Sequence, residues 1–226
     1  MIRALVFDFD GLILDSESPT FASWAEVFRS QGAELRLEIW SRYIGLVHGS
    51  FDPQEHLERA LGHPVDMEPL RAEKRRRFRE MLLAQPVMPG VMDYLDGARR
   101  LGLATAVASS APGEYVRGEL RRLGLFDRFA AVKCGEDAPR CKPAPDLYLA
   151  AVAALGVAAN EAVALEDSPN GVAAAKAAGL FCLAVPNAVT GHLDLGRADW
   201  TTPSLAELPL EELIRRAHAG NPSSCL

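Results

Sequence analysis

Short apolar runs alternate with helical segments through the second half of the chain. The runs cover residues 104–109, 130–134, 162–166 and 182–185, and a helix-length stretch separates each from the next. Such alternation is typical of a parallel sheet covered by helices. Helical stretches end at Gly102, Gly124, Gly156 and Gly179, as expected where a helix closes with a left-handed residue. The sequence therefore predicts an α/β fold.

For one helix in this pattern, the sequence also predicts which side is buried. Before Gly156, a set of apolar residues recurs at helical spacing: Leu147, Ala150, Ala151, Ala154 and Leu155. Residues spaced in this way share one side of a helix. We expect that side to pack on the sheet.

The first strand is separated from the other strands by a long insertion. Residues 2–9 are predicted to form a strand, yet the next strand-like run begins only at residue 104, too far for one crossover. Residues 16–85 carry helical signals only, with apolar faces that include Trp24, Phe28 and Leu57. We therefore expect a core of residues 1–15 and 86–226 and a helical unit of residues 16–85, which returns through residues 86–90.

Charge and hydropathy restrict the classes of partner. The 226 residues carry a formal net charge of −6, which disfavours a nucleic-acid partner, because phosphate backbones are bound mainly through Lys and Arg. Residues 71–79 are basic, but apolar residues recur among them at helical spacing, which indicates a solvated helix face. No stretch approaches the length of a membrane span, and the first residues lack the apolar core of a signal peptide. We expect a cytoplasmic protein without a membrane partner.

Two aspartates follow the first predicted strand. Asp8 and Asp10 lie two positions apart before Gly11, at the end of a strand where open α/β sheets bind ligands. Two such carboxylates repel unless a divalent cation lies between them, or unless one holds a proton for general acid catalysis. The alternative is a turn in which Asp10 and Gly11 only reverse the chain.

Further polar residues follow the later strands. Glu166 and Asp167 end the run 162–166 and precede a Ser-Pro pair, so their alternative role is capping of the next helix. Ser109 could likewise be a helix cap, and Lys142 could simply be solvated. Taken together, carboxylates suit Mg²⁺ and nucleophilic attack, while a hydroxyl and an ammonium suit phosphate oxygens. The combination indicates phosphoryl transfer.

The same residues resemble a known series of motifs. The series Asp8-Phe-Asp10-Gly11, Ser109, Lys142-Pro143 and Glu166-Asp167 resembles the four motifs of the haloacid dehalogenase superfamily in both order and spacing. Residues 10–17, 88–90, 142–146 and 166–171 are similar to the branch that contains phosphatases and β-phosphoglucomutase, and the similarity covers nearly the whole chain. This resemblance implies a Rossmann-like parallel sheet core with an inserted α-helical cap domain at residues 16–85.

The resemblance also implies a role for each motif residue. Asp8 would form an aspartyl-phosphate, while Asp10 would protonate the leaving oxygen and later activate water. Ser109 and the Ser110 backbone N–H would hold the phosphoryl group, and Lys142 would neutralise charge shared between that group and Asp8.

Magnesium is the cofactor that the resemblance implies. Its ligands would be the Asp8 carboxylate, the Asp10 backbone carbonyl and Asp167, with Glu166 binding directly or through water.

Substrate contacts are expected in the cap, with Glu17, Thr20, Trp24, Tyr43 and His48 as candidates. The chain departs here from mutase-like relatives, which usually have a histidine at the position of Thr20 and a lysine and an arginine at those of Ile44 and His48. The missing arginine removes a bidentate phosphate clamp. As alternatives, His48 could be solvated, and the two aromatic residues could pack within the cap.

These features predict a magnesium-dependent phosphatase that hydrolyses a small phosphorylated metabolite such as a sugar phosphate, as a monomer or weak homodimer. One alternative is a β-phosphoglucomutase-like phosphomutase with the same Asp8 intermediate. Another is a non-catalytic phosphate-binding protein on the same fold. Dehalogenation is disfavoured because the dehalogenases of the superfamily lack the aspartate that Asp10 supplies.

Overall fold

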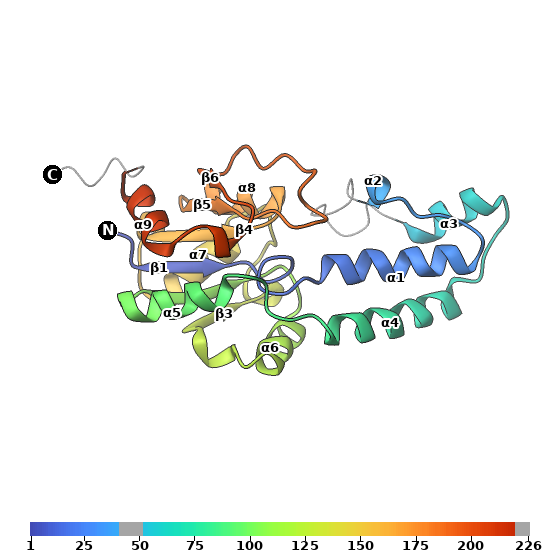
Figure 1. The fold of residues 1–226 in the computed structure, drawn as a ribbon, viewed down its shortest axis with the longest axis horizontal. Helices are drawn as coiled ribbons and strands as arrows, with labels where there is room; N and C mark the ends of the chain where they lie inside the picture. The colour runs from blue at the N-terminus through green and yellow to red at the C-terminus, as the bar shows by residue number, and fades with distance from the viewer. Residues whose placement is uncertain (41–51, 220–226) are drawn as a thin grey trace.

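A computed structural model describes residues 1–40 and 52–219 (Figure 1). In this part of the chain six strands form one sheet, in the order β3-β2-β1-β4-β5-β6, and each neighbouring pair is parallel. The strands are β1 (Ala4–Phe7), β2 (Ala104–Ala108), β3 (Ala131–Lys133), β4 (Ala162–Glu166), β5 (Phe181–Ala184) and β6 (Trp200–Thr201). In such a doubly wound sheet the strand order reverses between β1 and β4, and ligands bind outside the carboxyl ends at that point.

Alternate residues of β1 pack on opposite faces of the sheet. Leu5 and Phe7 belong to an apolar cluster with α5 (Val91–Leu101), α6 (Gly113–Arg122) and α9 (Leu210–Ala219). Ala4 and Val6 belong to a second cluster, with α7 (Asp146–Leu155) and α8 (Pro169–Ala177). Helices thus cover both faces of the sheet, as expected for a central strand such as β1, whose four residues are all apolar and buried. The predicted α/β class is confirmed. Short 3₁₀ helices lie at Phe126–Arg128, Gly135–Asp137, Ala159–Glu161 and Leu205–Glu207.

The first four of the helices between β1 and β2 extend from one end of the sheet. They are α1 (Glu17–Ser30), α2 (Leu37–Trp40), α3 (Pro53–Leu61) and α4 (Met67–Leu83), and α1 and α4 lie side by side (Figure 1). Their buried side chains form a cluster of their own, which includes Trp24, Phe28 and Leu57. At the base of this helical segment Leu14 forms a β-bridge with Val87. The division into core and cap domains stays a prediction.

The predicted face of α7 was partly wrong. Leu147 and Ala151 are fully buried, but Ala154 is exposed, and the other buried positions are Tyr148 and Val152. Nearly every residue of α7 is apolar, so spacing alone could not distinguish neighbouring faces of the helix.

The basic residues of α4 form ion pairs at the surface. The guanidinium of Arg76 lies 2.7 Å from both Glu73 and Glu80, and Arg77 pairs with Glu73 and with Glu26 of α1. The arginine side chains are 36–54% exposed, as predicted for a solvated helix face. Of the helices described, none has the length and apolar character needed to cross a membrane.

Candidate active site

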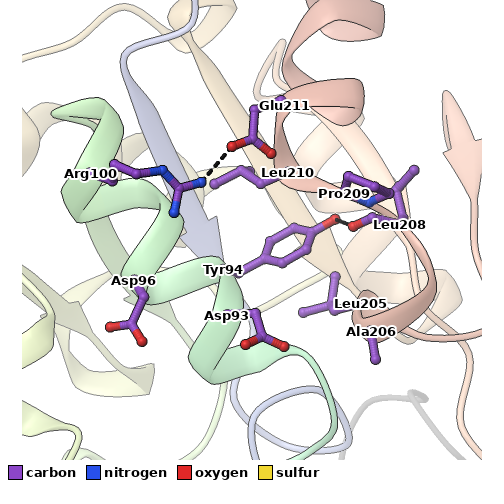
Figure 2. Close-up of a pocket in the computed structure, with 10 residues that line it drawn as sticks. All are labelled: Asp93, Tyr94, Asp96, Arg100, Leu205, Ala206, Leu208, Pro209, Leu210 and Glu211. Atoms are coloured by element: carbon purple, nitrogen blue, oxygen red, sulfur yellow. Dashed lines mark hydrogen bonds and ion pairs between the residues drawn. The ribbon is translucent and has the colours of Figure 1, made fainter.

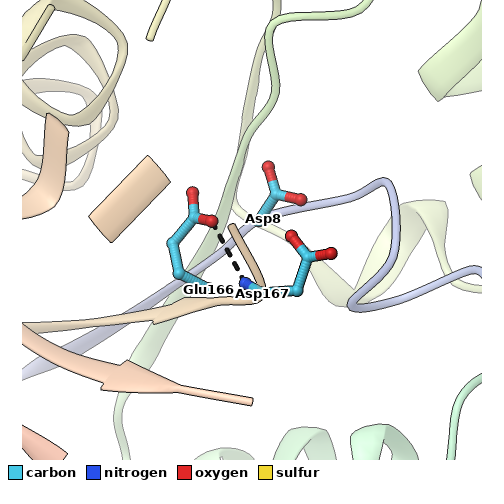
Figure 3. Close-up of side chains that lie close together, drawn as sticks. All are labelled: Asp8, Glu166 and Asp167. Carbon is cyan, nitrogen blue, oxygen red and sulfur yellow. Dashed lines mark hydrogen bonds between the residues drawn. The ribbon is translucent and has the colours of Figure 1, made fainter. Parts of the chain in front are cut away.

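Three buried carboxylates meet where the strand order reverses. Asp8 follows β1, and Glu166 and Asp167 stand at the end of β4, which pairs directly with β1. One carboxylate oxygen from each lies within 4.8 Å of the others, and the residues are 7%, 0% and 3% exposed. Figure 3 shows the carboxylates of Asp8 and Asp167 next to one another. Two of the four predicted strand ends thus form one acidic cluster.

Lys142 places an ammonium group in this cluster. Its Nζ lies 2.5 Å from Asp8 Oδ1 and 2.5 Å from Glu166 Oε1, and its side chain is only 6% exposed. The Tyr148 hydroxyl donates to the same Glu166 oxygen at 2.7 Å, and the Tyr148 ring lies under the ammonium group. Lys142 is therefore a buried partner of two carboxylates, and the alternative of a solvated lysine is wrong.

The second acidic pair is not used as a helix cap. Ser168 caps α8, because its hydroxyl accepts the Gly171 N–H at 3.1 Å. Glu166 Oε2 accepts the backbone N–H groups of Asp167 and Ser168, as the dashed line in Figure 3 marks for Asp167. Since both oxygens of Glu166 have partners, Asp8 and Asp167 are better placed for direct metal contact.

Asp10 is held by two hydroxyl groups. Its Oδ1 accepts a hydrogen bond from Ser16 at 2.7 Å and from Tyr115 at 3.1 Å. The Tyr115 ring packs edge-on against Phe9, with ring centroids 5.8 Å apart. The chain does turn here, because the Gly11 N–H donates to the Leu14 carbonyl at 2.8 Å. The predicted turn is therefore present, and the Asp10 carboxylate is held in one orientation as well.

The two predicted phosphate-binding serines follow β2. Ser109 is 1% exposed, and its hydroxyl accepts the Ala111 N–H at 3.1 Å. Ser110 is exposed, and its hydroxyl accepts the Lys142 N–H at 3.3 Å. The helix that follows, α6, has Pro112 at its N-cap, so neither serine is the cap of that helix.

The electrostatics of the cluster disfavour negative charge. Burial raises the pKa of Asp8, and the nearby Lys142 ammonium opposes this rise. Burial and the charges of Asp8 and Glu166 raise the pKa of Asp167 well above its ordinary value. Burial also raises the pKa of Asp10, against the hydrogen bonds from Ser16 and Tyr115. One ammonium therefore faces more carboxylates than it can neutralise.

This donor set fits a magnesium ion. Carboxylate oxygens are its preferred protein ligands, and Mg–O distances of about 2.0–2.1 Å place two ligands at most ~4.2 Å apart. One oxygen from each of Asp8, Glu166 and Asp167 lies within 4.8 Å of the others, so at most a shift of several tenths of an ångström would bring them to the spacing of ligands on one ion. A dication would also balance the excess negative charge.

The predicted cap residues lie in different surroundings. Glu17 begins α1 and is half-buried; burial first, then the charges of Asp10 and Asp15, raise its pKa to about 7. The Thr20 hydroxyl donates to the Ser16 carbonyl at 2.7 Å, and Trp24 is 8% exposed within the helical cluster. Tyr43 and His48, like Ile44, lie outside the described residues.

A pocket of about 280 Å³ lies elsewhere, between α5 and the start of α9 (Figure 2). Its walls are joined by the Tyr94 hydroxyl, which donates to the Leu208 carbonyl at 2.9 Å, and by the Arg100–Glu211 ion pair at 2.5 Å. None of the predicted site residues lines this pocket.

Comparisons with known proteins identify the family of this chain. Residues 2–179 match the family model of haloacid dehalogenase-like hydrolases. The chain belongs to the haloacid dehalogenase-like hydrolase family. YhcW of Bacillus subtilis (strain 168), which carries a provisional name as a phosphatase, is 42% identical over 221 residues, 98% of this chain and 100% of YhcW.

Two further relatives are similar over most of this hydrolase. The phosphorylated carbohydrates phosphatase of Thermotoga maritima is 31% identical, over 94% of this chain and 97% of its own. A crystal structure of a CbbY mutant from Rhodobacter sphaeroides, in complex with xylulose-(1,5)bisphosphate, has a TM-score of 0.72 and 31% identity, over 94% and 99% of the two chains.

Several residues near the site were not predicted from the sequence. Ser16 and Tyr115 contact Asp10, and Asn187 contacts Asp167. Lys74 of α4 lies over the rings of Phe78 and Trp24, with its charge opposing the raised pKa of Glu17. Ser16 lies within the motif of residues 10–17, six positions from Asp10, but no role was assigned to it. Tyr115 and Asn187 lie 105 and 20 positions from their partners, so a resemblance in motifs carries no signal for them.

Proposed function

We propose that this hydrolase is a magnesium-dependent phosphatase that acts on a small phosphorylated carbohydrate or similar monoester through an aspartyl-phosphate on Asp8. The observation that carries the proposal is the cluster of Asp8, Lys142, Glu166 and Asp167 at the β1–β4 crevice, with Asp10 beside it. A purely structural ion pair would not need unbalanced carboxylates at this edge of the sheet.

In the first step, an oxygen of the Asp8 carboxylate attacks phosphorus, and the bond from phosphorus to the ester oxygen breaks. Asp10 gives its proton to the leaving oxygen, so the alcohol departs neutral. Lys142 reduces the repulsion between Asp8 and the phosphoryl oxygens, since its ammonium group lies 2.5 Å from Asp8. Ser109 and Ser110, at the end of β2, would hold the phosphoryl group.

In the second step, Asp10 takes a proton from water while the water oxygen attacks phosphorus. The bond from phosphorus to Asp8 breaks, phosphate leaves, and the carboxylate is restored. One residue thus serves as acid and then as base. Hydrogen bonds from Ser16 and Tyr115 to a single oxygen of Asp10 would keep its carboxylate in one orientation through both steps.

Asp8 and Asp167 would hold Mg²⁺ together with the Asp10 carbonyl, and Glu166 would support them from the Lys142 side. When bound, the ion would supply positive charge to the phosphoryl oxygens. In this proposal residues 16–85 form a cap domain beside the site, where Glu17 and Lys74 could contact the substrate.

The direct test is a screen of phosphorylated sugars and related monoesters, with and without Mg²⁺, followed by release of inorganic phosphate. We expect magnesium-dependent release, and acid-quenched enzyme should carry phosphate on Asp8 when examined by mass spectrometry. Mg²⁺ binding with no turnover of any ester would instead favour a phosphate-binding protein. Turnover without phosphate on Asp8 would refute the covalent step.

A phosphomutase is the second candidate, and Lys74 is the observation that favours it. A mutase must hold the distal phosphate of a bisphosphate intermediate, which needs cationic groups in the cap. Lys74 is one such cation, but burial lowers its pKa, and it lacks the bidentate geometry of arginine. We therefore expect hydrolysis to outrun transfer when β-glucose 1-phosphate is supplied with a trace of glucose 1,6-bisphosphate. Rapid formation of glucose 6-phosphate with negligible phosphate release would instead identify a mutase.

A further inference from the structure

The loop after β5 contains a turn built around the side chain of Asn187. Its Oδ1 accepts the N–H groups of Val189 and Thr190, both at 2.9 Å. Its own N–H donates to the Thr190 hydroxyl at 3.0 Å. Because only an oxygen can accept both N–H groups, the orientation of the carboxamide is determined, and its NH₂ group must point away from the turn.

That NH₂ group points at the acidic cluster. Asn187 Nδ2 donates to Asp167 Oδ2 at 2.7 Å and to the Gly11 carbonyl at 3.1 Å. One side chain therefore links the loops that follow β1, β4 and β5. The packing around it is tight, because a Cβ on Gly11 would lie 2.2 Å from Asp167 Oδ2 and 2.6 Å from Asn187 Nδ2.

The other end of the turn packs against the helices between residues 17 and 83. Val189 is 3% exposed and packs in the apolar cluster that includes Trp24, Val27 and Phe28. Among the members described for this cluster, Val189 alone lies beyond residue 70. The turn thus contacts the helices through Val189 and the carboxylate through Asn187, only two residues apart.

We propose that Asn187 is a positioning residue for Asp167, and that its turn couples the packing of helices α1–α4 to the geometry of the acidic cluster. An amide donor suits this task because it stabilises the ionised carboxylate, which metal binding requires, without adding charge of its own. Holding Oδ2 also defines the plane of the carboxylate, and therefore the direction of Oδ1. The proposal rests on the assignment of Asp167 as a magnesium ligand.

The first test is the affinity of the metal-free protein for Mg²⁺ alone, measured by isothermal titration calorimetry. Asn187→Ser keeps an oxygen that can accept a turn N–H but is too short to reach Asp167. We expect its Kd for Mg²⁺ to rise about 10- to 100-fold, the usual effect of losing such a supporting contact. Asn160→Ser is the matched control, since Asn160 is exposed and precedes β4 at the opposite end of the strand.

The second arm tests the coupling. Val189→Ala leaves the Asn187 side chain intact but trims its neighbour in the helical cluster, so the Kd for Mg²⁺ should rise about 2- to 30-fold. Circular dichroism establishes that each variant is folded. At saturating Mg²⁺ the kcat of Asn187→Ser should recover to near that of the wild type, whereas a residue that contacts substrate would not be rescued in this way.

The outcomes distinguish a failure of the metal site from a failure of the positioning role. If the wild-type protein binds no Mg²⁺, the assignment of Asp167 falls, and the positioning role falls with it. If the wild type binds Mg²⁺ and Asn187→Ser binds it equally well, only the positioning role is overturned. A wild-type affinity in Val189→Ala overturns the coupling to the helices.

Discussion

The two hydrogen bonds to Asp10 allow its proposed role to be tested without touching the aspartate itself. Tyr115→Phe removes one hydroxyl donor and keeps the ring that packs on Phe9. A hydrogen bond to a charged group contributes about 1.5–3 kcal/mol. Tyr115 donates at 3.1 Å while Ser16 donates to the same oxygen at 2.7 Å, so the lower end of this range applies. About 1.5 kcal/mol corresponds to roughly a tenfold loss of rate.

The assay compares two kinds of leaving group, because only one of them needs a proton. An alkyl phosphate departs as a strongly basic alkoxide unless Asp10 protonates it, whereas p-nitrophenyl phosphate releases a phenolate that is stable near neutral pH. The ratio kcat/KM reports the steps up to phosphoryl transfer to Asp8 and is independent of later hydrolysis. We expect Tyr115→Phe to lower kcat/KM roughly tenfold for the best alkyl substrate and to change it little for the aryl ester.

Tyr94→Phe is the matched control for this experiment. Tyr94 is a buried tyrosine whose hydroxyl, like that of the half-buried Tyr115, donates a hydrogen bond, here to the Leu208 carbonyl at 2.9 Å, but it lies in the pocket of Figure 2. Its loss should cost about 1 kcal/mol of stability and leave both kcat/KM values unchanged. Equal losses on alkyl and aryl esters in Tyr115→Phe would refute the link between Tyr115 and proton transfer, as would no loss on either.

Three further predictions follow from the acidic cluster. Asp8→Asn should keep the fold, as seen by circular dichroism, yet abolish phosphate release, because a neutral amide is neither nucleophile nor good metal ligand; near-normal turnover would contradict the covalent mechanism. Asp167→Ala should raise the Mg²⁺ concentration needed for activity or eliminate it, whereas a loss of stability alone would argue against metal binding. Burial raises the pKa of Glu17 to about 7 and also raises that of Asp8, so the native state binds more protons than the unfolded chain. The unfolding free energy of the metal-free protein, from urea titrations, should therefore rise as the pH falls from about 8 to about 5; a decrease would contradict these shifts.

The fold could be predicted largely from local sequence. The strand expected at residues 162–166 is β4 itself, and the others differ by a few residues at their ends. Each glycine expected to close a helix, at positions 102, 124, 156 and 179, has the positive φ that only glycine adopts readily. By contrast, the short β6 (Trp200–Thr201) was missed, because two residues are too few for a periodic pattern.

Parts of the candidate site could also be predicted from the sequence, and other parts could not. Asp8, Glu166 and Asp167 could be predicted to meet, because parallel strands bring their carboxyl ends to one edge. Tyr115 contacts Asp10 from 105 positions away, and Asn187 contacts Asp167 from 20 positions away. No sequence spacing predicts either contact. Such contacts depend on rotamers and on tertiary packing, which hydrophobic periodicity does not encode.

The acidic cluster destabilises the folded state, whereas the apolar packing around the rest of the sheet stabilises it. Elsewhere the sheet is covered by two apolar layers, whereas at the β1–β4 crevice several carboxylates are buried beside the ammonium of Lys142. Burial raises the pKa values of Asp8, Asp10 and Asp167, which means that the ionised cluster is destabilised. Protons or a cation can relieve this, and a dication relieves it without protonating Asp8, the proposed nucleophile. Features that break the local rules of a fold concentrate at functional sites. The proposed chemistry and the electrostatic destabilisation of this crevice therefore have one cause, the excess of buried negative charge.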